Sequence, residues 1–281
     1  MHDAALTGNP EAEARGYLLD FCWPGGDRYC VKCKAESPYV LKTGRLRCTR
    51  CGYTFHDFSG RWINSGNMSC RAWLDLLELF IAEKTINVVS SELGVSYNTA
   101  YKAVSAIRRS ILAHALDAPI LLAPETGLGL LPGKANNKAA RLSPKSPVFG
   151  IVEESGFVFA DFLPDFSAET ILHFKINFKL KTTRIGGLVF SDPYRKYSTL
   201  VCCPGDEVEG EYFGSDESAA PLGEKSDFWV YARERITRFH GVKKQHFPLY
   251  LKELEFRYNH RQQDIMSILS QYLCALVPKF D

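Results

Sequence analysis

Apolar residues recur at helical spacing in the second quarter of the chain. Trp73, Leu76, Leu77 and Phe80 fall three or four positions apart with acidic residues between them, which predicts an amphipathic helix starting near Ser69. Thr85 is the expected N-cap of a second helix from Ile86 to about Leu93, and Ser96 that of a third helix reaching about Ala115. Gly94 interrupts the chain between them. Residues 68–116 therefore predict a helix-turn-helix, with a purely structural helical hairpin as the alternative.

The third helix of this segment begins with polar and aromatic residues. In a helix-turn-helix the second helix of the motif enters the major groove, and its first turns meet the base edges. On that interpretation the residues that open the recognition helix are Tyr97, Asn98, Thr99, Tyr101 and Lys102.

Beyond Asp117 the pattern changes from helical spacing to short apolar runs. Strands are expected at Ile120–Ala123, Val148–Glu153, Phe157–Phe162 and Leu188–Asp192. The segments between and after them are a basic loop at 127–147, a helix from Ser167, an acidic irregular stretch at 205–223, a helix at Lys225–Phe239 and another after Pro248. This order predicts an α/β or α+β domain with a mixed sheet over residues 117–281.

Two C-x-x-C pairs precede the helices. Cys30 with Cys33 and Cys48 with Cys51 have the spacing of a zinc ribbon, in which four thiolates hold one tetrahedral Zn²⁺. The alternative is four ordinary reduced cysteines. Short strands are expected at Tyr39–Lys42, Leu46–Cys48 and Tyr53–Phe55. The zinc ribbon is assigned to residues 25–62, and residues 1–24 form a lead-in that is either loosely ordered or a short helix.

Composition narrows the class of protein. Of 281 residues 46% are hydrophobic and 23% are charged, with a net charge of +2, as in an ordinary globular protein. No signal peptide or membrane-spanning run is apparent, so a reducing cytoplasm is expected. The five cysteines outside the ribbon are expected to be buried thiols. They are Cys22, Cys70, Cys202, Cys203 and Cys274.

Positive charge gathers around the metal motif. The stretch from Arg28 to Arg61 contains two acidic residues, Glu36 and Asp57, and a clear excess of bases, which predicts contact with phosphate. The expected DNA contacts are Arg45, Arg47, Arg50, Tyr97, Asn98, Thr99 and Lys102.

Four later motifs carry a resemblance over nearly the whole chain. They are Pro147–Glu153, Val189–Tyr197, Phe228–Arg233 and Tyr250–Arg261. Together with the zinc ribbon and the helix-turn-helix, they resemble bacterial insertion-sequence transposases that have a DDE-type, RNase H-like nuclease domain. The resemblance implies an α+β multidomain fold, double-stranded DNA and transposon ends as partners, a homo-oligomer on DNA, and a place in the bacterial cytoplasm at the nucleoid. It also implies two Mg²⁺ ions held by carboxylates.

The catalytic residues that the resemblance implies are only partly present. Asp192 matches the second carboxylate, and Arg233 matches the base that accompanies the late helix. Pro124 stands where the first Asp is expected, and Ser226 stands at the position of the third ligand. Glu125 and Asp227 lie one residue further on. A one-residue slip turns a strand side chain to the opposite face and rotates a helix side chain by about 100°.

The late helices carry many bases, which could either hold the DNA backbone or form a solvated exterior. They are Arg233, Arg235, Arg238, Lys243, Lys244, Lys252, Arg257 and Arg261. Three hypotheses follow for the whole chain. The favoured one is a DNA-binding transposase relative with a degenerate nuclease site. The others are an active Mg²⁺-dependent transposase with substituted carboxylates, and a zinc-dependent regulatory or interaction protein.

Overall fold

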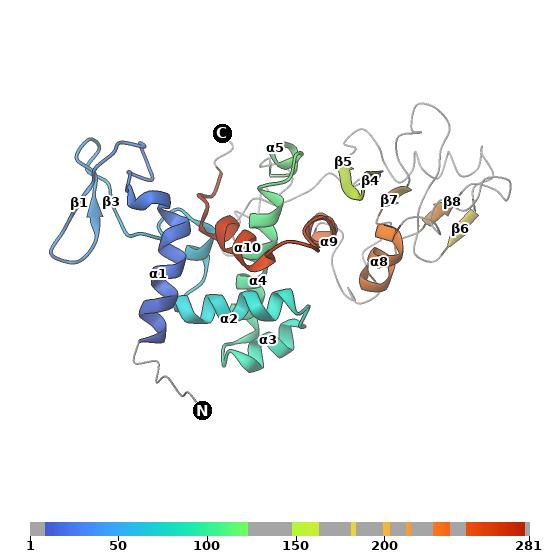
Figure 1. Ribbon diagram of the computed structural model, residues 1–281, viewed down its shortest axis with the longest axis horizontal. Coiled ribbons are helices and arrows are strands. Elements are labelled where there is room, and N and C mark those ends of the chain that lie inside the picture. Colours follow the sequence, from blue (N-terminus) through green and yellow to red (C-terminus); the bar gives the residue numbers. More distant parts are fainter. Residues whose placement is uncertain are drawn as a thin grey trace. The chain divides into compact units, whose positions relative to one another are not determined.

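The computed structural model describes residues 9–122, 148–162, 181–183, 199–202, 212–214, 227–236 and 246–278. The chain forms two compact units (Figure 1). The first unit contains residues 1–110 and 264–279, and the second contains residues 111–263.

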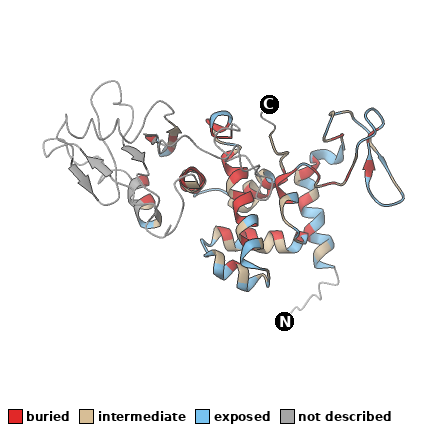
Figure 2. Ribbon diagram, turned by 180° about the vertical axis from the view of Figure 1, so that it is seen from behind, coloured by how far each residue is buried: buried red, intermediate tan, exposed pale blue. Residues whose placement is uncertain are grey.

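Three helices pack together in the first unit (Figure 1). They are α1 (Pro10–Cys22), α2 (Cys70–Ile81) and α10 (Ile265–Cys274), and each contacts the other two. Each begins at a side-chain cap, supplied by Asn9, Ser69 and Asp264 respectively. Figure 2 shows buried residues along one side of these helices and exposed residues along the other.

The structure settles one open alternative and corrects one assignment. Within the lead-in, Pro10–Cys22 forms the short helix α1, one of the two expected forms, and its Leu18 and Cys22 are buried. The segment that forms α10 was assigned to the last domain by its position in the chain, whereas the structure packs it in the first unit. Its Leu269 and Leu273 are fully buried there.

The zinc ribbon contains the three short strands that were predicted, and they pair as an antiparallel sheet. Its strands are β1 (Tyr39–Val40), β2 (Leu46–Arg47) and β3 (Thr54–Phe55). Leu46 pairs with Phe55, and both side chains are buried. Tyr39 pairs with Arg47, which in turn pairs with Thr54. These three residues therefore share the opposite, outward face of the sheet.

Arg61 ties the ribbon to the helices. It is 3% exposed, and its guanidinium donates to the carbonyls of Cys22 at 2.6 Å, Asp57 at 3.2 Å and Cys274. It also lies 4.4 Å from the centre of the Trp23 ring. The connecting turns are η1 (Pro24–Gly26) and η2 (Trp62–Ser65). The residues after α10 return to the same place, because Val277 N–H donates to the Gly60 carbonyl at 2.8 Å.

The predicted helix–turn–helix order is present in the structure. Helix α3 spans Ile86–Glu92 with Thr85 as its cap, and α4 spans Tyr97–Leu112. The turn passes through Gly94, which has a φ of +60°, a region that glycine enters without strain. Ser90 Oγ donates to the Val95 carbonyl at 2.6 Å and Ser96 Oγ accepts from Thr99 N–H at 3.1 Å, so side chains fix both ends of the turn.

The second unit begins with a short helix where a strand was expected. Ile120–Ala123 was expected to be a strand, but Ala118–Leu121 forms the one-turn helix α5. Pro119 suits the first turn of a helix, and Leu121 and Leu122 are buried in the core of this unit. Asp117 Oδ1, just before the helix, lies 2.8 Å from Lys252 Nζ.

The described strands of the second unit form two antiparallel sheets. Strands β5 (Phe157–Phe162), β4 (Val148–Glu154) and β7 (Thr199–Cys202) pair in that order, and β6 (Lys181–Thr183) pairs with β8 (Tyr212–Gly214). The strands predicted from Val148 and Phe157 are confirmed, whereas β8 falls in the stretch expected to be irregular. The strand predicted to end at Asp192, which would decide whether the sheet is mixed, and the helix from Ser167 lie outside the described residues.

Helices α8 (Asp227–Ile236) and α9 (Phe247–Asn259) complete the second unit near their predicted places. For Lys252 and Arg257 both expectations, a surface that holds the DNA backbone and a solvated exterior, are wrong. Lys252 is 1% exposed and bonds Glu255 at 2.9 Å, and buried Arg257 bonds Glu253 at 2.8 Å. These two side chains are buried and paired with carboxylates, so they do not face solvent.

Side chains of α9 close the outer edge of β5. Asn259 accepts from Val158 N–H at 2.8 Å and donates to the Val158 carbonyl at 2.7 Å. Two residues along the strand, Glu255 accepts from Ala160 N–H at 2.9 Å and Lys252 donates to the Ala160 carbonyl at 2.6 Å. The helix thus supplies the hydrogen bonds that a further strand would make. This explains why the motif Tyr250–Arg261 has its particular polar residues. No helix in the described part of the chain is long and apolar enough to cross a membrane.

Candidate functional site

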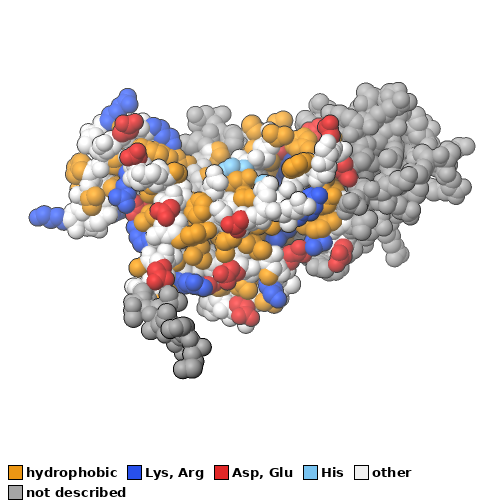
Figure 3. Space-filling model, in the orientation of Figure 1, with side chains coloured by type: hydrophobic (Ala, Val, Ile, Leu, Met, Phe, Trp, Pro, Cys, Tyr) orange, Lys and Arg blue, Asp and Glu red, His pale blue; other side chains and the backbone are white. Residues whose placement is uncertain are grey.

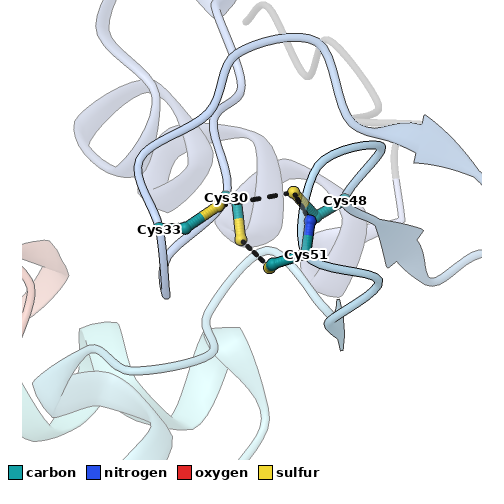
Figure 4. A group of neighbouring side chains, drawn as sticks. All are labelled: Cys30, Cys33, Cys48 and Cys51. Carbon is teal, nitrogen blue, oxygen red and sulfur yellow. Dashed lines mark hydrogen bonds between the residues drawn. The ribbon is translucent and has the colours of Figure 1, made fainter.

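The four predicted metal ligands converge. The Sγ atoms of Cys30, Cys33, Cys48 and Cys51 all lie within 4.8 Å of one another (Figure 4). Cys30 lies 3.6 Å from Cys51, and Cys33 lies 3.6 Å from Cys48. A zinc ion with Zn–S bonds of about 2.3 Å separates its sulfur ligands by roughly 3.8 Å. The spacing of the thiols therefore fits one tetrahedral zinc ion.

The electrostatics of the cluster also favour a cation. The Cys51 N–H, followed by the Arg50 N–H, points at Cys48 Sγ and helps to lower the pKa of that thiol to about 6. The pKa of Cys51 is about 11: the Tyr53 N–H lowers it, but desolvation and the neighbouring cysteines outweigh that contribution. The Cys48 thiolate therefore forms readily, whereas the Cys51 thiolate is destabilised by the neighbouring cysteines. A divalent cation stabilises all of these thiolates, so the donor set suits a structural Zn²⁺.

The predicted DNA contacts of the ribbon are on its surface. Arg45, Arg47 and Arg50 are all exposed, and Lys and Arg side chains stand out around the ribbon at the left of Figure 3. Asp57, by contrast, is buried and bound by Arg15 at 2.5 Å and by Arg28 at 3.1 Å. Its negative charge is neutralised locally, so it subtracts little from the positive surface.

The predicted recognition residues are exposed at the start of α4. Tyr97 is 52% exposed and stacks on Tyr101 with ring centres 6.4 Å apart. Asn98 and Lys102 are exposed, and Thr99 is half-buried beside the cap Ser96. The other side of the helix is buried through Ala100, Ala103, Val104 and Ile107. The first turns of α4 therefore offer polar and aromatic groups from a fixed base.

The catalytic positions cannot be placed in the same way. Pro124, Asp192 and Ser226 lie outside the described residues, as do Glu125 and the side chain of Asp227. Arg233 lies on α8, but its side chain is outside the described set.

Sequence reasoning missed two aromatic residues of the ribbon. Tyr39 lies opposite Arg47 on the outward face and is 48% exposed. Half-buried His56 follows β3, and desolvation and then the charge of Arg45 lower its pKa. The strand period could have indicated Tyr39, but the environment of His56 depends on the fold.

Comparison with known proteins agrees with this organisation. Residues 9–54 match the model of a transposase zinc-ribbon domain, and residues 126–259 match that of an ISXO2-like transposase domain. The first match begins at the cap of α1 and so includes that helix with the ribbon.

Two curated proteins are similar. A Haemophilus influenzae "transposase-like protein" is 31% identical over 121 residues, which are 41% of this chain and 91% of the relative. A Halobacterium salinarum "protein in transposable element ISH50" is 33% identical over 116 residues, which are 39% of this chain but 37% of the relative. No solved structure matches significantly. The two domain matches, and a relative covered almost throughout, show that this chain belongs to the family of ISXO2-like transposases.

Proposed function

We propose that this transposase-family chain binds double-stranded DNA, transposon ends included, and that its own nuclease site is inactive. Residues 68–116 act as a helix-turn-helix that recognises bases, and the zinc ribbon adds contacts to the DNA backbone. The protein works as a homo-oligomer on DNA, at the nucleoid of a bacterial cytoplasm.

One observation carries the DNA-binding part of the proposal. The first turns of α4 expose Tyr97, Asn98 and Lys102, while its other side is buried. A helix that is fixed on one side and exposes polar groups at its N-terminal end suits insertion into the major groove. The alternative, a helical hairpin with a purely structural role, gives no reason for an amide, a lysine and a tyrosine to be exposed together.

The inactive nuclease site is argued from the sequence. Two-metal phosphoryl transfer requires several carboxylates around the ions. The family resemblance assigns three ligand positions, and Pro124 and Ser226 occupy two of them. Neither proline nor serine brings a negative charge, so Asp192 alone would have to concentrate Mg²⁺. The match to the ISXO2-like domain starts at residue 126, just after the position of the first expected carboxylate.

Binding is tested with the zinc-loaded full chain and a randomised duplex library, from which bound DNA is selected and sequenced. An enriched motif is expected. Asn98→Ala should then reduce discrimination between the motif and scrambled duplex, since one good bidentate base contact contributes about 1–3 kcal/mol. Glu92→Ala, at the end of α3, is the exposed control outside the predicted contact set. Failure to bind any duplex at low salt would leave only the regulatory or interaction hypothesis.

Catalysis is tested on the selected duplex with Mg²⁺ or Mn²⁺. No strand cleavage or joining is expected from the natural sequence. The double substitution Pro124→Asp with Ser226→Glu restores both expected ligands, and any activity it gains should vanish with Asp192→Ala. Metal-dependent cleavage by the natural sequence, abolished by Asp192→Ala, would overturn the proposal in favour of an active enzyme with substituted carboxylates.

A further inference from the structure

The outward face of the zinc ribbon combines aromatic rings with guanidinium groups. Antiparallel register places Tyr39 opposite Arg47, and Arg47 opposite Thr54. Arg45 lies two residues before Arg47, and half-buried His56 lies two residues after Thr54, so strand alternation places both on the same face. The face is thus built from two rings and two arginines, with Tyr39 as its most exposed ring.

The arginines of this face are unlike those inside the fold. Arg61 is buried and satisfied by three carbonyls, whereas Arg45 and Arg47 are exposed. A Cβ at Gly52 would lie 3.9 Å from Arg47 Nη2, so this guanidinium lies over the glycine of the second cysteine pair. Positive charge and aromatic side chains therefore extend from β1 to the turn that carries Cys48 and Cys51.

Two lysines of the ribbon also lie over aromatic rings. Lys34 lies 5.1 Å from the centre of the Tyr29 ring, and Lys32 lies 5.9 Å from that of Tyr53. Arg28 is paired with Asp57, and from Tyr29 to Phe55 the sequence has one acidic residue, Glu36, against a larger set of basic residues. The basic residues are Lys32, Lys34, Lys42, Arg45, Arg47 and Arg50. Even with four thiolates around one Zn²⁺, the ribbon keeps a positive excess.

Rings and positive charge together favour one form of DNA. In a duplex the bases are stacked on one another and present only their edges to a protein. In a single strand the faces of the nucleobases are free to stack on Tyr and His rings and on guanidinium planes. Lys and Arg side chains contact the phosphates along the strand. We propose that the outward face of the zinc ribbon, formed by Tyr39, Arg45, Arg47 and His56, binds single-stranded DNA. This inference rests on the proposed DNA binding. The two arginines can contact the phosphates of either form of DNA, and the exposed Tyr39 ring adds the preference for a single strand.

The test measures by fluorescence anisotropy how the zinc-loaded full chain binds two probes. One is an oligothymidylate of about twelve nucleotides, a length within the range of known single-strand binding sites, and the other is a duplex of the selected motif. Tyr39→Leu removes the ring and keeps an apolar side chain. It should weaken oligothymidylate binding by about 5- to 150-fold and leave duplex binding within about two-fold. Tyr39→Phe keeps the ring and should bind like the natural sequence. Tyr17→Leu, which changes an exposed tyrosine of α1, is the matched control.

A second measurement follows the phosphates. Arg47→Gln should reduce the dependence of log affinity on log salt concentration for oligothymidylate by about 0.7, the value expected for one phosphate contact with a single strand. Zinc content and far-ultraviolet circular dichroism establish that each variant is folded.

The outcomes separate this inference from the proposed function. If Tyr39→Leu leaves both affinities unchanged, or weakens both equally, the ribbon has no surface specific for single strands and the inference is wrong. If the natural sequence binds oligothymidylate but no duplex, this inference stands and the proposed recognition of double-stranded DNA is wrong. If Asn98→Ala impairs only duplex binding while Tyr39→Leu impairs only oligothymidylate binding, both are supported.

Discussion

Asn259→Asp is the sharpest test of how the second unit is held together. Asn259 makes both hydrogen bonds to Val158 at the outer edge of β5, at 2.8 and 2.7 Å. The substitution keeps the shape of the side chain and its acceptor for Val158 N–H. It removes the donor to the Val158 carbonyl and sets a carboxylate against that oxygen.

The expected loss can be worked from these contacts. Leaving a buried carbonyl without its donor costs about 1–3 kcal/mol, and repulsion between the carboxylate and the carbonyl dipole adds to it. Asn259 also lines a cavity of about 550 Å³, which offers room for water to reach the carbonyl. The loss should therefore be about 2 kcal/mol, which speeds hydrogen exchange of the Val158 amide by about 30-fold where local opening controls exchange.

The pH dependence gives a second check. The new carboxyl lies against a carbonyl, so its pKa in the folded protein should be raised above about 3.9, its value in the unfolded chain. The defect is then complete above the folded pKa and shrinks as the pH falls below it, because the protonated carboxyl can donate to the Val158 carbonyl.

The assay is amide hydrogen exchange by nuclear magnetic resonance across β4 and β5. Gln263→Glu is the matched control, since it makes the same amide-to-acid change at an exposed position of the second unit and should shift stability by less than about 0.5 kcal/mol. If Val158 exchange in Asn259→Asp stays within about three-fold of the natural sequence, the side-chain closure of the edge is refuted.

Three further predictions concern the first unit. Arg61→Met should lower the free energy of unfolding by about 3 kcal/mol in urea denaturation, because three carbonyls lose a charged donor. Arg28→Met, which removes an exposed guanidinium and leaves Arg15 bound to Asp57, should cost less than about 1 kcal/mol. Glu11 accepts from the Arg71 and Cys70 N–H groups, which lower its pKa, so its stabilising effect should disappear as the pH falls below about 4.5, and Glu11→Gln should reduce the acid sensitivity of the urea midpoint. Removal of zinc by a chelator should abolish the ribbon fold in far-ultraviolet circular dichroism, as should Cys51→Ser; a ribbon that keeps its strands without zinc contradicts a structural role for the ion.

Local signals explain which parts of the fold the sequence could predict. Ser69, Thr85 and Ser96 cap α2, α3 and α4 through their own side chains, so residues a few positions apart decide those boundaries. The metal site is equally local, because each cysteine pair lies on its own turn. These elements match their predictions within a few residues.

The failures share a different cause. Ile120–Ala123 is a short apolar run, and such a run suits a strand or a buried helical turn equally well. Its helix depends on Pro119 and on packing in the core, while Asp117 pairs with Lys252 far along the chain. Lys252 was itself expected on the surface. A buried lysine is stable there only because Asp117 and Glu255 lie beside it, and no local pattern reveals partners at that distance.

Helix α10 changes how the ribbon should be regarded. Its fully buried Leu269 and Leu273 contribute to the first unit, and the carbonyl of Cys274 receives the Arg61 guanidinium, so the C-terminal helix and the ribbon stabilise each other. The first unit thus has its own metal site and its own packed helices, closed by α10. Pro124 and Ser226 belong to the other unit. Residues in separate units are coupled less strongly in stability than residues in contact, so under the proposed function the loss of nuclease ligands leaves the proposed DNA-binding unit free to persist.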